Sequence, residues 1–230
     1  SACGKNLSTE TVSTIGEQRE TNYALAPMTE EEFLEAVTQG QSVAPLYFLF
    51  AATKNRESRE LLEHVAVRRL DLIEVQDAVA SGAVVIDGRD DTEFAQGHLR
   101  GSINVGLGGR FAEYTGEVMQ PGTPIVLVTD PGQEEVAATR LARIGFDNVV
   151  GALADPIKTF VEHPEAVEQL SRLTAAQFDQ RREHVPGLVL VDVRNPGEVA
   201  LGSIPGARPV SLPQLLTRLG ELDRTAPTVV

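Results

Sequence analysis

One sequence pattern occurs twice in this chain, with 105 positions between corresponding residues. The matched pairs are Asp87 with Asp192, Arg89 with Arg194, Glu93 with Glu198, Gly97 with Gly202, and Gly101 with Gly206. No insertion or deletion interrupts this spacing. The chain therefore contains two related units, copy one and copy two, and copy two stops earlier in its pattern than copy one.

The balance of charge excludes several classes of partner. With 33 acidic and 20 basic residues, the 230-residue chain carries a formal net charge of −13, and it has no run of Lys or Arg. A surface for nucleic acid or anionic lipid needs clustered positive charge, so we expect neither partner. No apolar stretch reaches the roughly 20 residues of a membrane span. The longest candidate, Leu46 to Ala52, has the length of a core element.

Cysteine usage and the two ends of the sequence give further expectations. A single cysteine, Cys3, excludes a disulfide framework and indicates a reducing compartment, so we expect a cytoplasmic protein. The sequence starts at Ser1 without a secretory leader and ends at Val230 inside an apolar run typical of a strand. We therefore expect a part of a longer protein.

Composition and periodicity divide the chain into four segments: 1–67, 68–153, a partly helical connector at 154–172, and 173–230. In the second segment, apolar runs at 83–87, 124–128 and 146–150 alternate with helical spacing at 73–79 and 134–144. Such continuous runs are typical of strands buried on both faces of a parallel sheet. The alternation predicts an α/β unit with a mostly parallel sheet.

The outer segments carry their own signals. Residues Thr174 to Gln177 form a helix-initiating capping box, followed by a predicted strand at Leu188–Asp192 and a predicted helix at Pro213–Leu222. In the first segment, a capping box at Thr29–Glu32 predicts a helix that ends at Gly40. The run Leu46–Phe50 is a buried strand or a buried helix, and its periodicity does not decide between them.

The repeated pattern, Asp-x-Arg-x-x-x-Glu-x-x-x-Gly, resembles rhodanese domains. Copy one has the fuller match, which extends through Phe94, His98, Leu99, Ser102, Ile103 and Asn104. Copy two has Ser203 where copy one has His98. The resemblance implies an α/β fold in which a rhodanese-like parallel sheet with flanking helices is duplicated, the second copy being incomplete.

The chemistry of the patterned residues favours a structural role over a catalytic one. An aspartate at the end of a strand, such as Asp87, can accept hydrogen bonds from loop N–H groups. The Arg and Glu of each copy, Arg89 with Glu93 and Arg194 with Glu198, can pair across a helical turn. None of these side chains is a nucleophile, so we expect them to hold the fold.

The resemblance also indicates where catalysis would occur. Active rhodaneses carry a cysteine in the loop between a central strand and the next helix, where backbone N–H groups and the helix N-terminus lower the pKa of the thiol. In copy one, Asp130 stands at that position, Pro131 lacks an N–H donor, and Glu134 and Glu135 add negative charge. We expect no catalytic residue in copy one. The corresponding loop of copy two would follow Val230.

The first segment resembles a different family. Residues 1–7, 13–19 and 21–25 look like the end of a metallo-β-lactamase-type αββα domain in proteins that fuse this domain to rhodanese repeats. This resemblance implies that the parent protein binds zinc or iron through ligands upstream of Ser1. We therefore expect no metal or cofactor ligand here, and surface or structural roles for the widely spaced His64, His98, His163 and His184.

Three residues near the start are candidates for the substrate entrance of the parent protein: Cys3, Lys5 and Asn6. Cys3 is either a reactive thiol or a small loop residue. We favour the loop residue, because among its neighbours only Lys5 would lower the pKa of the thiol.

Two functional hypotheses follow. In the first, the parent is a persulfide dioxygenase-like enzyme or a related hydrolase that acts on a small-molecule persulfide or thioester, and this chain alone is inactive. In the second, copy one is a non-catalytic interaction or scaffold module. A homo-oligomer fits either hypothesis.

Overall fold

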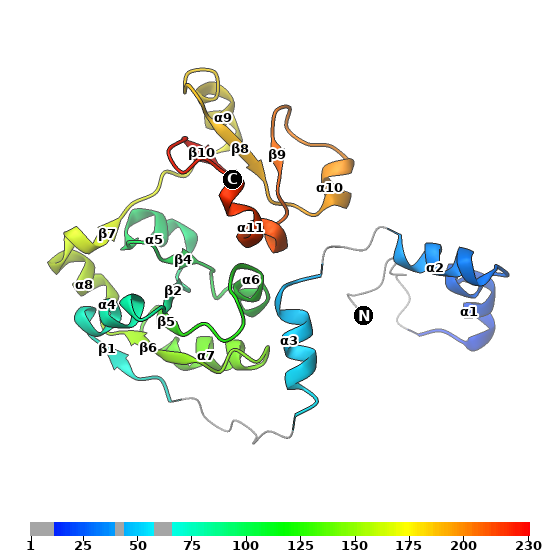
Figure 1. Ribbon diagram of the computed structural model, residues 1–230, viewed down its shortest axis with the longest axis horizontal. Helices are drawn as coiled ribbons and strands as arrows, with labels where there is room; N and C mark the ends of the chain where they lie inside the picture. The colour runs from blue at the N-terminus through cyan, green and yellow to red at the C-terminus, as the bar shows by residue number, and fades with distance from the viewer. Residues whose placement is uncertain (1–11, 40–43, 58–65) are drawn as a thin grey trace.

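The computed structural model describes residues 12–39, 44–57 and 66–230 (Figure 1). The N-terminal elements are α1 (Ile15–Thr21), the 3-10 helix η1 (Tyr23–Leu25), α2 (Glu30–Thr38) and α3 (Tyr47–Lys54). Thr14 and Thr29 begin α1 and α2 with reciprocal capping boxes, which confirms the predicted start of α2. Gly40, the predicted end of that helix, lies outside the described residues.

Copy one builds a five-stranded parallel sheet in the order β1-β6-β5-β2-β4. Its strands are β1 (Arg69–Leu70), β2 (Val84–Asp87), β4 (Ile103–Asn104), β5 (Ile125–Val128) and β6 (Val149–Leu153). Its helices are α4 (Leu72–Ala80), α5 (Asp91–Gln96), α6 (Phe111–Val118), α7 (Glu134–Ala142) and α8 (Pro156–Glu162). This α/β sandwich confirms the predicted fold class.

The two faces of the sheet form separate hydrophobic cores, because successive side chains of a strand point to opposite sides. On one face, Ile86, Ile125 and Leu127 pack with α6 and α7. On the other face, Val85 and Val126 pack with α4 and with Phe160 of α8. The central strand β5 is buried along its whole length, which explains its continuous apolar sequence.

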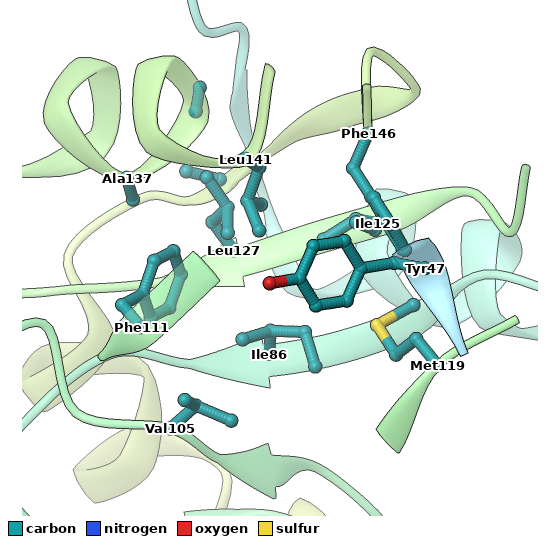
Figure 2. Packing of buried hydrophobic residues seen from close by; sticks show 12 residues of the cluster. Tyr47, Ile86, Val105, Phe111, Met119, Ile125, Leu127, Ala137, Leu141 and Phe146 are labelled. Atoms are coloured by element: carbon teal, nitrogen blue, oxygen red, sulfur yellow. The ribbon is translucent and has the colours of Figure 1, made fainter. Parts of the chain in front are cut away.

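Helix α3 packs into the first of these cores, although it lies in the segment predicted to belong to an upstream domain. Its first residue, Tyr47, is only 8 % exposed and packs with Ile86, Phe111 and Met119 (Figure 2). The run predicted as a strand or a helix is therefore the start of a helix, with Leu46 as the N-cap of α3. Of this run, Tyr47 is buried and Phe50 is partly buried against the same core, whereas Phe48 and Leu49 are 53 % and 80 % exposed.

A glycine on α6 makes room for this tyrosine. A Cβ atom at Gly116 would lie 2.4 Å from the Tyr47 ring, closer than atoms can approach. The adjacent Glu117 is buried, and burial together with the nearby charge of Glu113 raises the pKa of its carboxyl. The pKa of Tyr47 is raised by its own burial and by the same two carboxylates. The α3–α6 contact is thus tight and encloses a titratable acid.

Copy two repeats the central part of this design in a smaller sheet, β10-β8-β9. Its elements are α9 (Ala175–Arg181), β8 (Val189–Asp192), α10 (Pro196–Ala200), β9 (Arg208–Pro209), α11 (Leu212–Arg218), the 3-10 helix η3 (Leu219–Glu221) and β10 (Thr228–Val229). Val189 pairs with Thr228 as Val84 pairs with Ile125, so the strand register is the same in both copies. Helix α11 of copy two packs against α6 of copy one (Figure 1).

Two predicted boundaries were wrong. The third strand of copy one covers Val149–Leu153 rather than 146–150, because Gly145 and Phe146 close the end of α7 through hydrogen bonds to Ala142 and Leu141. The helix predicted at Pro213–Leu222 becomes 3-10 after Arg218. The connector adds the 3-10 helix η2 (Pro164–Ala166) and the strand β7 (Val167–Glu168), which pairs antiparallel with β3 (His98–Leu99) and was not predicted.

Candidate functional site

The candidate site is a cleft of about 860 Å³ at the carboxyl ends of the parallel strands of copy one. Three loops form its walls: the loop after β2, the loop from Val105 to Arg110 after β4, and the loop from Asp130 to Gln133 after β5. Leu212 of copy two closes one side. We call this space the repeat-interface cleft. In open α/β sheets, ligands bind at this edge.

The loop after β5 is the one in which the resemblance places the rhodanese cysteine. It folds as a tight turn: the Gln133 N–H donates to the Asp130 carbonyl at 3.1 Å, with Pro131 and Gly132 between them. Gly132 has a φ of +83°, and a proline followed by a glycine of positive φ is the signature of a type II turn. Asp130 stands at the first position of this turn and is exposed.

This turn removes the features that support a nucleophilic sulfur. Pro131 has no N–H, and the N–H of Gln133 is already bonded within the turn. The first turn of α7 carries Glu134 and Glu135, so negative charge replaces the positive field of an open helix N-terminus. An exposed carboxylate in a closed turn can bind cations or accept hydrogen bonds, but it cannot carry a persulfide.

The aspartate and arginine of the repeated pattern form a buried ion pair in copy one. Asp87 accepts from Nε of Arg89 at 3.0 Å and from its Nη2 at 2.5 Å, and it also accepts the Arg89 N–H at 3.0 Å. Nη2 of Arg89 donates further to the carbonyl of Gly97 at 2.9 Å. The Phe160 ring of α8 covers the guanidinium, with its centroid 4.8 Å away. The pair thus ties β2 to α5 and α8, and the expected role of Asp87 as an acceptor of loop N–H groups is confirmed.

Copy two forms the same ion pair from Asp192 and Arg194. Nε and Nη2 of Arg194 donate to Asp192 at 2.9 and 2.6 Å, and Nη2 reaches the carbonyl of Gly202 at 2.9 Å. The hydrogen bonds from Arg194 hold the pKa of Asp192 below its usual range.

The predicted pairing of arginine with the glutamate four positions later is therefore wrong in both copies. The aspartate two positions before each arginine already takes its Nε and Nη2. In copy two, Glu198 instead accepts the N–H of Asn195 at 3.1 Å and helps to begin α10.

Two further residues distinguish copy one. Nδ2 of Asn104 donates to the carbonyls of Asp87 and Arg89, at 2.9 and 3.0 Å, and so fixes the loop after β2. Copy two has Pro209 at the corresponding position and lacks these donors. His98 is buried, stacks on Phe94 at 3.8 Å and contacts the Phe94 carbonyl through Nδ1 at 2.8 Å. Its role is structural, as expected.

Arg140 of α7 fixes the glycine-rich wall of the cleft. Its Nη1 donates to the carbonyl of Leu107 and its Nη2 to the carbonyl of Gly109, each at 2.5 Å. Sequence reasoning missed this residue, because its partners lie 33 and 31 positions away and are backbone atoms. The sequence did contain one signal for such a residue. The glycine-rich stretch Gly106–Gly109 is conformationally free, so a side chain from elsewhere must fix its shape.

The remaining predicted site residues fall elsewhere. Cys3, Lys5, Asn6 and His64 lie outside the described residues. His163 lies at the surface, where its Nδ1 is 3.2 Å from a carboxylate oxygen of Glu165. Within residues 12–39, 44–57 and 66–230, no three His, Cys, Asp or Glu side chains are grouped so that they could hold a metal ion. The described residues therefore do not fit the zinc or iron centre that the metallo-β-lactamase resemblance implies.

Comparisons with known proteins support the fold. The profile of the rhodanese-like domain matches residues 71–162. A crystal structure named as a metallo-beta-lactamase from Staphylococcus aureus is similar at 23 % identity and a TM-score of 0.51, over 61 % of this chain and 40 % of that one. The chain thus spans less than half of that protein. At such identity the likeness concerns the fold alone.

Other solved structures are similar at lower scores. A thiosulfate sulfurtransferase from Pseudomonas aeruginosa matches at 21 % identity and a TM-score of 0.37, over 67 % of this chain and 36 % of that one. The Alr3790 protein from Anabaena matches at 14 % identity and a TM-score of 0.40, over 50 % and 93 % of the two chains. No curated protein matches the chain. None of the described helices has the length and apolar character needed to cross a bilayer.

The parallel sheet, the strand-end Asp–Arg pair and the profile match agree: residues 71–162 of this chain have a rhodanese-like fold and match the profile of the rhodanese-like domain.

Proposed function

We propose that this chain is the C-terminal part of a metallo-β-lactamase–rhodanese protein of sulfur metabolism, and that copy one acts in it as a scaffold without sulfurtransferase activity. The observation that carries the proposal is the loop after β5. A Pro-Gly turn that begins at Asp130 replaces the cysteine-bearing loop of active rhodaneses. In the parent, the substrate would be a small-molecule persulfide or thioester, and zinc or iron would be bound upstream.

The contacts of α6 support the scaffold role. One part of α6 receives Tyr47 of α3 in the space beside Gly116. Another part packs against α11 of copy two. Copy one therefore connects the segment that precedes it with the repeat that follows it, which is what a spacer between two functional units must do.

The test is to place a cysteine at the expected position and measure its thiol. In a Cys3→Ser background, the Asp130→Cys thiol should show an ordinary pKa near 8.5, because the turn offers it few donors and α7 adds negative charge. Alkylation by iodoacetamide as a function of pH gives this value, and thiosulfate:cyanide transfer gives the activity. We expect no transfer.

A matched variant separates charge from backbone geometry. Adding Glu134→Gln and Glu135→Gln to Asp130→Cys should lower the thiol pKa, because two neighbouring negative charges are removed. Transfer should remain absent, since the turn still lacks the cradle of N–H groups. Sulfur transfer by the single Asp130→Cys variant would show that the loop is competent and would overturn the proposal.

A further inference from the structure

The repeat-interface cleft is lined by groups of opposite charge, Arg110 and Asp130, that the scaffold role does not use. We propose that it binds a small zwitterionic molecule, of the size and charge of a short peptide, with the ammonium group at Asp130 and the carboxylate at Arg110 and the backbone N–H groups beside it. This proposal goes beyond the proposed function and does not depend on sulfur chemistry.

The carboxylate end is argued from the backbone of the glycine-rich loop. Arg140 holds the carbonyls of Leu107 and Gly109, and all peptide bonds of the described residues are trans. Because the C=O and N–H of a trans peptide point in opposite directions, the N–H groups of Gly108 and Arg110 point away from Arg140. Neither N–H donates to any described residue, and both residues line the cleft.

The side chain of Arg110 adds a positive charge at this end of the cleft. Its guanidinium lies above the Tyr114 ring, 5.2 Å from the centroid, and its nearest carboxylate, Glu113, is a loose 3.9 Å away. The side chain is 63 % exposed, so a ligand can reach it. A guanidinium with two free N–H groups nearby is a suitable set of donors for a carboxylate.

The ammonium end is argued by comparing the three carboxylates of the cleft. Asp90 accepts the N–H of Thr92 at 2.8 Å, and Asp91 pairs with Arg172 at 2.7 Å. Asp130 has no such partner among the described residues. It is therefore the carboxylate of this cleft that remains available to a cationic group.

The dimensions and remaining surface of the cleft fit a molecule of this class. Its volume of about 860 Å³ lies within the range of small-molecule sites, about 300–1,000 Å³. Leu107 and Leu212 add apolar surface to the lining of the cleft. Because Leu212 belongs to copy two, the site is complete only when both repeats are in place.

The experiment titrates the full ¹⁵N-labelled chain with trialanine, N-acetyl-trialanine and trialanine amide, followed by NMR. Trialanine should shift signals of Gly108, Gly109 and the Asp130 turn. Removal of either end charge, by acetylation or amidation, should weaken binding about tenfold, the value of one charge-assisted contact.

Variants assign each end of the ligand. Asp130→Asn should weaken the binding of trialanine about tenfold but leave the binding of N-acetyl-trialanine unchanged. Arg110→Gln should likewise weaken the binding of trialanine about tenfold but leave the binding of trialanine amide unchanged. The matched control Asp77→Asn, at an exposed position of α4 outside the cleft, should change the binding of none of these ligands.

A steric variant tests the location. A Cβ at Gly109 meets no atom within 4 Å, so Gly109→Val should fold and block the cleft, whereas Gly197→Val, equally open but in copy two, should not affect binding. Absence of trialanine binding, equal binding of the N-acetyl derivative, or binding that survives Gly109→Val would each overturn the proposal. Because these measurements involve no sulfur transfer, their failure is distinguishable from failure of the proposed function.

Discussion

In copy one, the side chains of Asp87 and Arg89 are 0 % and 3 % exposed, whereas their counterparts Asp192 and Arg194 in copy two are 10 % and 45 % exposed. The hydrogen bonds are nevertheless the same in both pairs. The short motif therefore fixes the geometry of the pair on its own. Its burial depends on elements that lie far away in the sequence.

Those covering elements are β6 and α8, which contribute Leu153 and Phe160 to one core of copy one. In copy two the corresponding surface is an open groove of about 790 Å³, lined by residues such as Leu190, Ile204 and Val229. The difference teaches that the same local motif can be a core element or a surface feature. The ion pair should therefore contribute more to the stability of copy one than to that of copy two.

We expect the largest difference in stability between the two copies when the arginine of each pair is removed. Arg89→Ala leaves Asp87 charged and buried without its partner, so we expect copy one to lose about 3–5 kcal/mol of unfolding free energy. Arg194→Ala should have a far smaller effect, since solvent can replace the lost contact. Urea unfolding followed by tyrosine fluorescence reports copy one, because the three tyrosines, at 23, 47 and 114, all precede copy two, and hydrogen exchange of β8 reports copy two. Equal losses in the two variants would contradict this account.

A second difference is the helix α3 that covers copy one. Gly116→Ala would force the Tyr47 ring out of its place, and we expect a loss of about 1–3 kcal/mol from this overpacking. Tyr47→Ala should make the additional Gly116→Ala change much less costly, because the clash with the ring is then gone and only Ile144 Cδ1, at 3.1 Å, remains close. Gly197→Ala in copy two, where the added Cβ meets nothing, is the control. Additive losses in the double variant would mean that Tyr47 and Gly116 do not interact.

The third difference is the response to pH, which should have opposite signs in the two copies. Burial raises the pKa of Glu117 above its ordinary 4.5, so its contribution to the stability of copy one is full below pH 4.5 and is lost as the pH rises through the raised value. Hydrogen bonds from Arg218 and Arg208 lower the pKa of Glu221 in copy two to about 2. Its contribution is present above pH 4.5 and is lost as the pH falls toward 2.

Unfolding measured between pH 3 and 8 checks this prediction. Glu117→Gln should raise the stability of copy one at pH 7 and flatten its dependence on pH. Glu221→Gln should reduce the loss of stability of copy two at acid pH and leave the pH dependence of its stability near neutral pH unchanged. Hydrogen exchange of β8 measures this. The same slope in wild type and Glu117→Gln would show that this carboxyl has no part in the stability of copy one.

Much of this fold could be predicted from local sequence. The capping boxes of α2 and α9 and the apolar runs of β2 and β5 act over a few residues, and the structure confirms them. What could not be predicted depends on distant contacts. Three such contacts join segments at least 31 positions apart. They are the packing of Tyr47 beside Gly116, the pairing of β3 with β7, and the hydrogen bonds from Arg140 to the glycine-rich loop.

The candidate site shows the same division. Asp130 and Pro131 could be identified by position, because the strand before them is unmistakable in the sequence. The turn that they form follows from the adjacent Gly132, whose φ is +83°. That Leu212 of copy two would close the cleft was beyond reach, since no local pattern reports how two repeats pack.

Hydrogen exchange of the intact chain tests the central contrast most directly. The amides of β2, at Val84–Asp87, should exchange at least about 100-fold more slowly than those of β8, at Val189–Asp192, because closed copy one opens only with global unfolding whereas open copy two exposes its strands locally. Equal protection of the two strands would contradict the account, since it would mean that copy two is as fully covered as copy one.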